Sequence, residues 1–159
     1  MQPCTMNKFI FTIAISLLTV TLWRCSKDTL FLSNQNAVQV GFYSSHTGKD
    51  TTILNFSAHG LGRLKDSLIY KNDTTNKAFL PLRFDGDTTK FVLKMFLRFD
   101  TVTFIHTKNE VYISSEGGFT YNLHLKKIEY TQNFVDTAVV AIPGVNYNEN
   151  TENVKIYIY

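Results

Sequence analysis

The stretch "VYISSEGGFTYNLHL", residues 111–125, gathers side chains that carry much of enzyme chemistry. Ser114 and Ser115 are candidate nucleophiles if a base activates them, and Gly117-Gly118 could cradle an anion ahead of a helix. However, the serines do not stand in a G-x-S-x-G elbow, and the residues after the glycines alternate as a strand does. We therefore interpret the stretch as a β-hairpin, with Gly117 and Gly118 as a structural turn that uses the positive φ open to glycine.

Metal chemistry has two weak candidates in this chain. Asp85-Gly86-Asp87 resembles the start of a calcium loop, but Asp-Gly is also a hairpin-turn signal and the other calcium ligands are missing. Six of the eight aspartates precede threonine, which fits either strand entry or a cluster of carboxylates at one end of a sheet. The histidines show no metal-ligand spacing, so we predict no metal and no cofactor; they are His46, His59, His106 and His124.

Two of these histidines, His106 and His124, could approach each other if their strands paired, and we expect both to face solvent. No spacing selects a pair of carboxylates for glycoside hydrolysis. We therefore expect a non-enzymatic protein. Envelope polymer (glycan) hydrolysis or glycan binding remains the alternative.

Tyr157 and Tyr159 are candidates for an interaction surface. They alternate with Ile156 and Ile158 near the end of the chain, so they would form an exposed aromatic strip if this were an edge strand. The other interpretation is two partly exposed strand tyrosines, since scattered apolar surface residues are normal.

Short runs rich in Val, Ile, Phe, Tyr and Thr must position these side chains. Several alternate with a period of two, as in "KFVLKMFLRF", "FTYNLHLK" and "NVKIYIY", whereas only 61–70 has helix-like spacing. The pattern predicts a single antiparallel β-sandwich domain over 37–159. The sequence leaves open whether the runs 88–99 and 101–107 are one bent strand or a hairpin around Asp100. The predicted strands are 37–43, 51–57, 79–84, 88–99, 101–107, 110–115, 118–130, 134–142 and 153–159.

The first 24 residues have the composition of a secretory signal peptide. The apolar run 9–23 has 15 residues, which is short for a bilayer span of about 20 residues. Leu22 stands three positions before Cys25, as in a lipobox, although Trp23 and Arg24 replace the usual small residues. Cleavage after residue 24 would leave Cys25 to carry acyl chains (diacylglyceryl and palmitate), which anchor a protein stably when there are two or more. The alternatives are an ordinary secreted protein or a single signal anchor.

Three segments follow from this interpretation: a signal peptide (1–24), a lipidated cysteine with its tether (25–36) and a domain (37–159). The full chain carries a net charge of +3. Residues 1–24 hold two basic and no acidic residues, so the remainder has 14 basic and 13 acidic residues, a net +1. No basic stripe is visible, and we predict no nucleic-acid partner.

The order of several short motifs resembles one known family. These are "VQVGFYS", "LPL", "FDTVTFIHT", "YISSEGGFTYNLHL", "TQNFVDTAVV" and "NVKIYIY". They resemble a family of uncharacterised lipoproteins from Bacteroidetes-type bacteria, defined as a domain of unknown function. The resemblance spans residues 25–159 and implies a cell-envelope location, lipidation and an all-β domain. On this basis we expect a lipoprotein of the outer membrane that binds or supports an outer-membrane protein or, failing that, a glycan.

Overall fold

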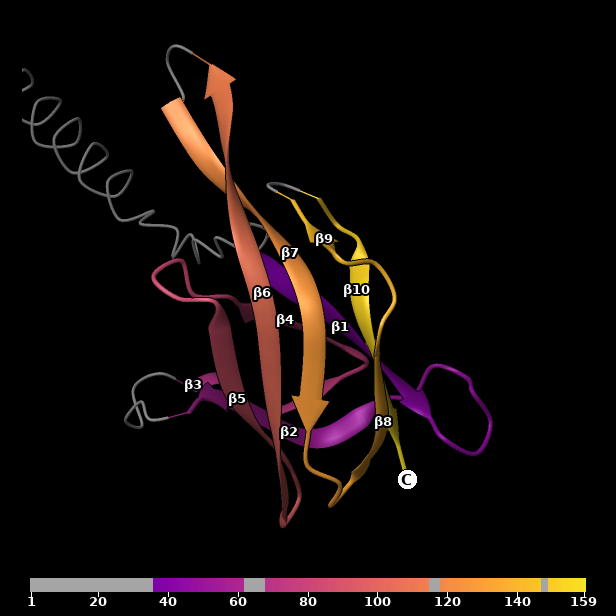
Figure 1. Cartoon of the computed structure of the whole chain (residues 1–159). Coiled ribbons are helices and arrows are strands. Elements are labelled where there is room, and N and C mark those ends of the chain that lie inside the picture. The colour runs from indigo at the N-terminus through magenta and orange to yellow at the C-terminus, as the bar shows by residue number, and fades with distance from the viewer. Residues whose placement is uncertain (1–35, 62–67, 115–117, 147–148) are drawn as a thin grey trace, which may run out of the picture. The chain divides into compact units, whose positions relative to one another are not determined.

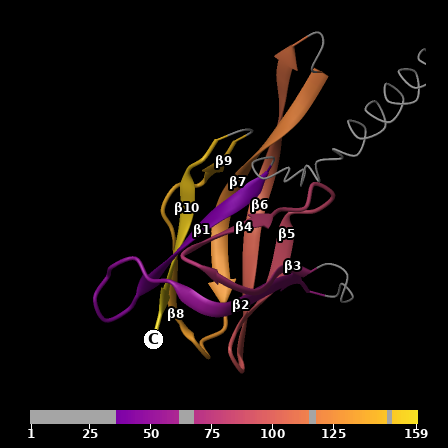
Figure 2. The ribbon, with the colours of Figure 1, turned by 180° about the vertical axis from the view of Figure 1, so that it is seen from behind.

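The computed structural model describes residues 36–61, 68–114, 118–146 and 149–159. Within these ranges the regular elements are all β-strands, and they form two sheets that face each other (Figures 1 and 2). The predicted all-β sandwich is therefore confirmed. In the same ranges, no helix is long and apolar enough to cross a bilayer. The signal peptide and tether, predicted over 1–36, lie outside the described residues apart from Asn36.

The smaller sheet contains both the first and the last strand of the domain. β1 and β10 pair in parallel at its centre, whereas its other two pairings are antiparallel. The strands are, in sheet order, β4 (Lys77–Pro81), β1 (Ala37–Ser44), β10 (Glu152–Ile158) and β8 (Val135–Val140).

The larger sheet is antiparallel throughout and is built around two hairpins that share β6. β6 spans 17 residues, so it pairs with β5 along its first half and with β7 along most of its length. The strands are, in sheet order, β3 (Leu68–Thr75), β2 (Ile53–Gly60), β5 (Thr88–Met95), β6 (Arg98–Ser114), β7 (Gly118–Tyr130) and β9 (Gly144–Val145).

The core lies between the sheets because one face of each strand is apolar. Phe42 of the smaller sheet meets Phe56 of the larger one with ring centroids 5.1 Å apart, in an edge-to-face arrangement. Phe91 and Phe104 make a second such contact at 6.0 Å. Aromatic pairs of this kind add about 0.5–1.5 kcal/mol to the stabilisation from burial itself. The fully buried side chains include Phe42, Phe56, Phe104, Phe134, Ile53, Leu80, Leu93, Leu123 and Ile156.

Three features differ from the predicted pattern of strands. The predicted runs 101–107 and 110–115 are parts of one strand, β6. The end of the run with helix-like spacing belongs to strand β3 (Leu68–Thr75), and residues 62–67 lie outside the described part of the chain. The run 88–99 is not one strand, because Met95 pairs with Arg98 and the chain reverses at Phe96-Leu97. The hairpin alternative was therefore right, but its turn lies before Asp100, within a run whose apolar alternation resembles an unbroken strand.

The outer half of the β6–β7 hairpin extends past the other strands. β5 pairs with β6 only as far as Ile105, and β9 reaches only Leu123 and His124 of β7. Beyond these points β6 and β7 pair with each other alone, up to Ser114 and Gly118. Both ribbon views show this hairpin projecting from one end of the sandwich (Figures 1 and 2). The predicted hairpin is thus present, while the connecting residues 115–117, including Gly117, lie outside the described residues.

Candidate functional site

An open pocket of about 890 Å³ lies where β4 leads into β5. Its wall combines apolar side chains with a cation and an ion pair. The Arg83 guanidinium donates two hydrogen bonds to Asp85, at 2.9 and 2.8 Å, so Asp85 is already engaged by a cation. The lining residues include Leu61, Ile69, Leu82, Arg83, Phe84, Asp85, Thr89, Lys90 and Phe91.

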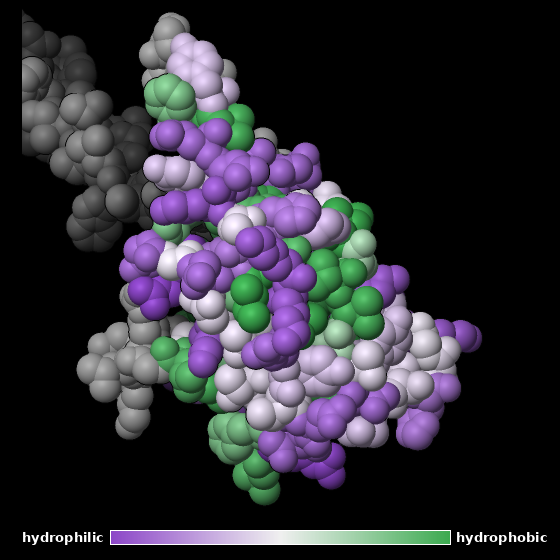
Figure 3. Space-filling model, viewed as in Figure 1, coloured by the Kyte–Doolittle hydropathy of each residue, from purple (hydrophilic) through white to green (hydrophobic). Residues whose placement is uncertain are grey.

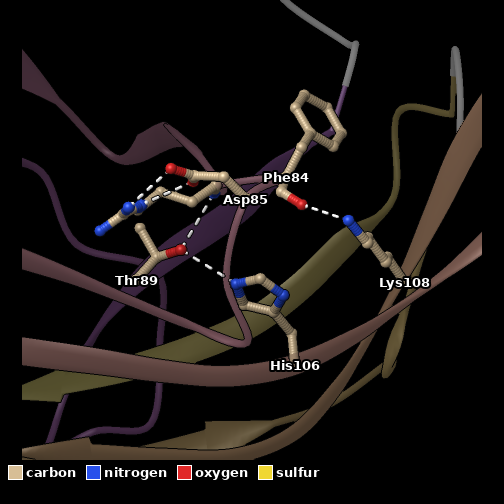
Figure 4. A network of polar contacts seen from close by, with 6 residues as sticks. Phe84, Asp85, Thr89, His106 and Lys108 are labelled. Carbon is tan, nitrogen blue, oxygen red and sulfur yellow. Dashed lines mark hydrogen bonds and ion pairs between the residues drawn. The ribbon is translucent and has the colours of Figure 1, made fainter.

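Behind the pocket wall, Thr89 and His106 form a buried polar pair (Figure 4). The Nε2 atom of His106 lies 2.9 Å from the Thr89 Oγ1 atom, which also accepts a hydrogen bond from the Arg83 N–H at 3.0 Å. Burial lowers the pKa of His106, and the nearby Asp87 charge offsets this only in part, so the imidazole is neutral at pH 7. Its Nδ1 atom is buried without a hydrogen-bond partner.

This pair does not have the form of an open catalytic dyad. His106 is 1% exposed, and Thr89 is 5% exposed with its oxygen already bonded to the backbone. General acid–base catalysis requires a group within reach of a substrate proton. We therefore assign Thr89 and His106 to bracing the loop that joins β4 to β5.

The expectation that His106 faces solvent was wrong. His106 shares the inward face of β6 with Val102 and Phe104, at spacings of two residues, and all three are buried. His124, in contrast, is exposed, as predicted. The strands do pair, but His106 stands opposite Leu125 and His124 opposite Thr107, so the two rings occupy different faces of the sheet.

The turn between β5 and β6 exposes a group of apolar side chains. Phe96 is 53%, Leu97 89% and Phe99 50% exposed. Phe96 also has a φ of 55°, in the left-handed region that penalises a residue with a Cβ atom. Figure 3 shows hydrophobic residues at this lower end of the molecule, over the β5–β6 connection of Figure 1.

Two cations flank this turn. The Lys94 ammonium lies 5.4 Å from the centroid of the Phe99 ring. The Arg98 guanidinium is 3.5 Å from the carbonyl oxygen of Asn133, on the neighbouring loop. We call Lys94 and the residues 96–99 the distal turn.

Asp100 fixes the loop beside the distal turn. Its carboxylate is 1% exposed and accepts hydrogen bonds from the backbone N–H groups of Asn133, Phe134 and Val135, at 2.9, 2.7 and 2.9 Å. The Thr131 hydroxyl and the Asn133 side-chain amide also donate to it. Burial alone would raise the pKa of Asp100, but these hydrogen bonds outweigh it and the pKa is lowered.

The projecting end of the β6–β7 hairpin carries an exposed aromatic pair. Tyr112 and Phe119 stand opposite each other across the two strands, with ring centroids 5.3 Å apart in an edge-to-face arrangement. They are 57% and 65% exposed. Closer to the sandwich, the Lys108 Nζ atom donates to the carbonyl of Phe84 at 2.6 Å (Figure 4). The same atom lies 5.4 Å from the centroid of the Tyr121 ring. The hairpin is thereby braced at its base.

The C-terminal tyrosines lie in a different setting from the one predicted. β10 is an inner strand between β1 and β8, so the condition for an aromatic strip on an edge strand is not met. Tyr157 is partly exposed and Tyr159 is exposed, which fits the other interpretation. The ring of Tyr157 lies 5.5 Å from that of Tyr43, and the Lys155 ammonium lies 4.9 Å from the Tyr43 ring. A hydrogen bond with Asp136 raises the pKa of Tyr159. None of these residues lines the pocket, whereas the Tyr159 N–H donates to the Phe134 carbonyl at 3.2 Å, on the loop beside the distal turn.

Sequence reasoning missed Asp100 and Phe96. Asp100 could have been found, because it occupies the same inward face as Val102 and Phe104, where a carboxylate must be hydrogen-bonded. Phe96 carried no signal, since turns with positive φ usually contain glycine or asparagine.

Within the described residues, no group of three or more His, Cys, Asp or Glu side chains is arranged to hold a metal ion.

Comparison with known proteins gives one match. Residues 57–158 match the model of a family of unknown function, DUF6452. No curated protein and no solved structure matches the chain. The match covers well over half of the chain and extends from β2 to β10, the part that holds the pocket, the distal turn and the hairpin. The chain therefore belongs to the DUF6452 family.

Proposed function

We propose that this protein is a non-enzymatic binding module of the cell envelope, anchored to a membrane through acyl chains on Cys25. It would bind an envelope protein, in the first place an outer-membrane protein, through the distal turn. The observation that carries this proposal is the exposure of Phe96, Leu97 and Phe99 on a turn whose backbone is strained at Phe96.

The strain supports a binding role because it opposes folding. A left-handed conformation costs a residue with a Cβ atom about 1–2 kcal/mol. Exposing large apolar side chains adds no compensating burial within the monomer. Strained residues of this kind cluster at functional sites, where a partner contact accounts for their retention.

The surroundings of the distal turn favour a protein partner with an acidic rim. Lys94 and Arg98 place two positive charges beside the apolar side chains, and the segment 94–99 contains no acidic residue. Aromatic and arginine side chains dominate binding hot spots. Asp100 holds the adjacent loop in place, so the turn would bind with little loss of conformational entropy.

The place where the described chain begins supports presentation of this turn away from the membrane. The Leu82 N–H donates to the Asn36 carbonyl at 2.9 Å, and Phe84, two residues later, contacts Tyr121 of the hairpin. The described chain therefore starts at the hairpin end of the sandwich. The distal turn lies at the other end of the larger sheet, where β6 begins.

The partner contact can be tested by replacing Leu97 with a photo-crosslinking amino acid in cells of the native host. The matched control places the same crosslinker at Val139, an exposed apolar residue of β8. We expect a discrete cross-linked envelope protein from position 97 that is absent from position 139. Equal products from both positions, or none from position 97, would exclude the distal turn as the binding surface.

Anchoring is tested separately with Cys25→Ala. We expect the variant to leave the membrane fraction and to lose its acyl label. A variant that stays in the membrane fraction unchanged would refute lipid anchoring at this residue.

A second candidate function is glycan binding in the pocket between β4 and β5. The partly exposed Phe84 ring and the Arg83–Asp85 pair supply an apolar face next to polar groups, which is the chemistry that a sugar ring requires. Calorimetric titration with envelope glycan fragments would test it, with Phe84→Ala as the variant. Binding that Phe84→Ala leaves intact would exclude this pocket.

A further inference from the structure

We propose that the aromatic pair Tyr112–Phe119 is a second membrane contact, which inserts into the interface of the bilayer that holds the lipid anchor and so fixes the orientation of the domain. This inference rests on the proposed anchoring at Cys25. In this proposal the end of the hairpin contacts lipid, whereas the distal turn contacts the protein partner.

The first argument is the exposure of the pair in spite of its apolar character. Tyr112 and Phe119 contact each other, and Val111 is exposed on the other face of the same strand. In Figure 3 this end of the molecule shows pale and green residues above a strongly hydrophilic band. An apolar end above a polar band is the distribution expected of a segment that enters a bilayer interface.

The second argument is the place where the described chain begins. Asn36 is hydrogen-bonded to Leu82, and the segment 82–84 contacts the base of the hairpin through Phe84. Tyr112 is four residues beyond Lys108 along β6, about 13 Å at the rise of a strand. Residues 26–36 could span at most about 36–40 Å. An anchor at Cys25 would therefore keep the aromatic pair within reach of the same bilayer.

The third argument concerns chemistry and charge. Tyrosine and phenylalanine combine large apolar area with few rotatable bonds, and aromatic residues are enriched at membrane–water interfaces. In the sequence, the outer half of the hairpin, 108–123, carries one cation, Lys108, and two anions, Glu110 and Glu116. The contact therefore needs no anionic lipid. Its binding should be insensitive to salt, unlike attraction to an anionic surface.

A second membrane contact would also change what the anchor does. Acyl chains fix the position of one residue, but they leave the domain free to rotate about its tether. Contact at the hairpin end would direct the long axis of β6 away from the membrane surface. Arg98 and Tyr112 are 14 residues apart on β6, so the distal turn would stand about 45 Å from the aromatic pair.

The chain offers a clean fluorescence test, because residues 25–159 contain no tryptophan and only one cysteine, Cys25. All described residues belong to one compact unit, so this chain can be studied without residues 1–24. Cys25 is coupled to a maleimide lipid in phosphatidylcholine vesicles, with or without bromine-labelled acyl chains, which quench tryptophan on contact. The reporter is Phe119→Trp, and the matched control is Phe96→Trp at the distal turn. Circular dichroism confirms that both variants fold, and Tyr112→Trp serves as a second reporter.

We expect Phe119→Trp to show a blue-shifted emission and strong quenching by the brominated lipid, at low and high salt alike. Phe96→Trp should show neither change. Equal quenching at both positions would mean that the domain lies on the bilayer without a fixed orientation, and no quenching at position 119 would mean that the hairpin stays in water or binds a protein instead. Either result overturns the proposal. Because the lipid is attached chemically, these results are independent of whether Cys25 is acylated in the cell, which the Cys25→Ala fractionation decides.

Discussion

The carboxylate of Asp100 accepts a hydrogen bond from the backbone N–H of Phe134 at 2.7 Å, and the two residues are 34 positions apart in the sequence. This bond ties the start of β6 to the loop that crosses from the larger sheet to β8 in the smaller one. It therefore links the two layers at the end where the distal turn lies.

Replacing Asp100 with Asn should destabilise the fold by about 2–3 kcal/mol, because hydrogen bonds to a charged acceptor contribute more than neutral ones. The asparagine amide would also place N–H groups against the N–H groups of Phe134 or Val135. Urea unfolding at pH 7 measures the difference. A loss below about 0.5 kcal/mol, the range of ordinary surface substitutions, would contradict the role given to Asp100.

The same residue predicts a pH dependence with a definite sign. The pKa of Asp100 is lowered in the folded state, so its contribution to stability is complete above the ordinary aspartate value of about 3.9. It is lost as the pH falls from there through the folded-state pKa. The gap in unfolding free energy between the wild type and Asp100→Asn should therefore shrink in acid. A gap that stays constant from pH 7 to pH 2 would argue against an ionised Asp100.

Phe96→Asn should stabilise the isolated protein by about 1 kcal/mol, because asparagine tolerates the left-handed conformation better than phenylalanine. The same change should weaken cross-linking of the partner at position 97. Thermal unfolding and the cross-linking yield measure the two effects. Leu54→Asn, at another exposed apolar residue of the larger sheet, is the control and should leave the cross-linking unchanged. A Phe96→Asn variant that is less stable, or that cross-links as well as the wild type, would contradict the binding role of the strain.

Gly41 occupies a position where a side chain has no room. A Cβ atom there would clash with the Glu152 Oε2 atom and would lie 3.0 Å from the Tyr43 ring. Glu152 cannot move freely, because its other oxygen accepts a hydrogen bond from the Tyr43 hydroxyl at 2.6 Å. Gly41→Ala should therefore destabilise the protein by about 1–2 kcal/mol, in the range of an overpacked site. Adding Glu152→Ala should recover part of this loss. Two independent losses that simply add would contradict the clash.

Much of the fold could be predicted from periodicity alone. Strand β7 begins and ends as predicted, and β1, β8 and β10 deviate by one or two residues, because alternation with a buried face is a local signal. The turn at Phe96-Leu97 could not be predicted, since the alternation of Phe91, Leu93, Met95, Leu97 and Phe99 continues straight through it. Only the pairing of β5 with β6 shows that Leu97 and Phe99 are exposed.

The candidate site was less predictable, because it depends on contacts between distant strands. The parallel pairing of β1 with β10 makes the C-terminal strand an inner one, and no local pattern encodes that choice. Similarly, the environment of His106 depends on Thr89, 17 residues away on a neighbouring strand. The exposed hairpin was predicted as a hairpin, but its projection depends on where its neighbours β5 and β9 end.

His106→Leu tests the buried polar pair of Thr89 and His106. The expected pH dependence comes from burial of a neutral imidazole and not from an ion pair. Burial lowers the pKa of His106, so His106 binds a proton at a higher pH in the unfolded chain than in the folded protein. The wild type should therefore lose stability as the pH falls below about 6.5, the ordinary histidine value, towards the lower folded-state pKa.

Leucine removes this effect and costs about 1 kcal/mol at pH 7.5 for the lost hydrogen bond to Thr89. Urea unfolding should then show that the free energy of unfolding of the variant increases relative to that of the wild type between pH 7.5 and pH 5. The control His124→Leu makes the same change at an exposed position of the neighbouring strand. If His106→Leu follows the wild-type profile, His106 is not the neutral, buried imidazole described here.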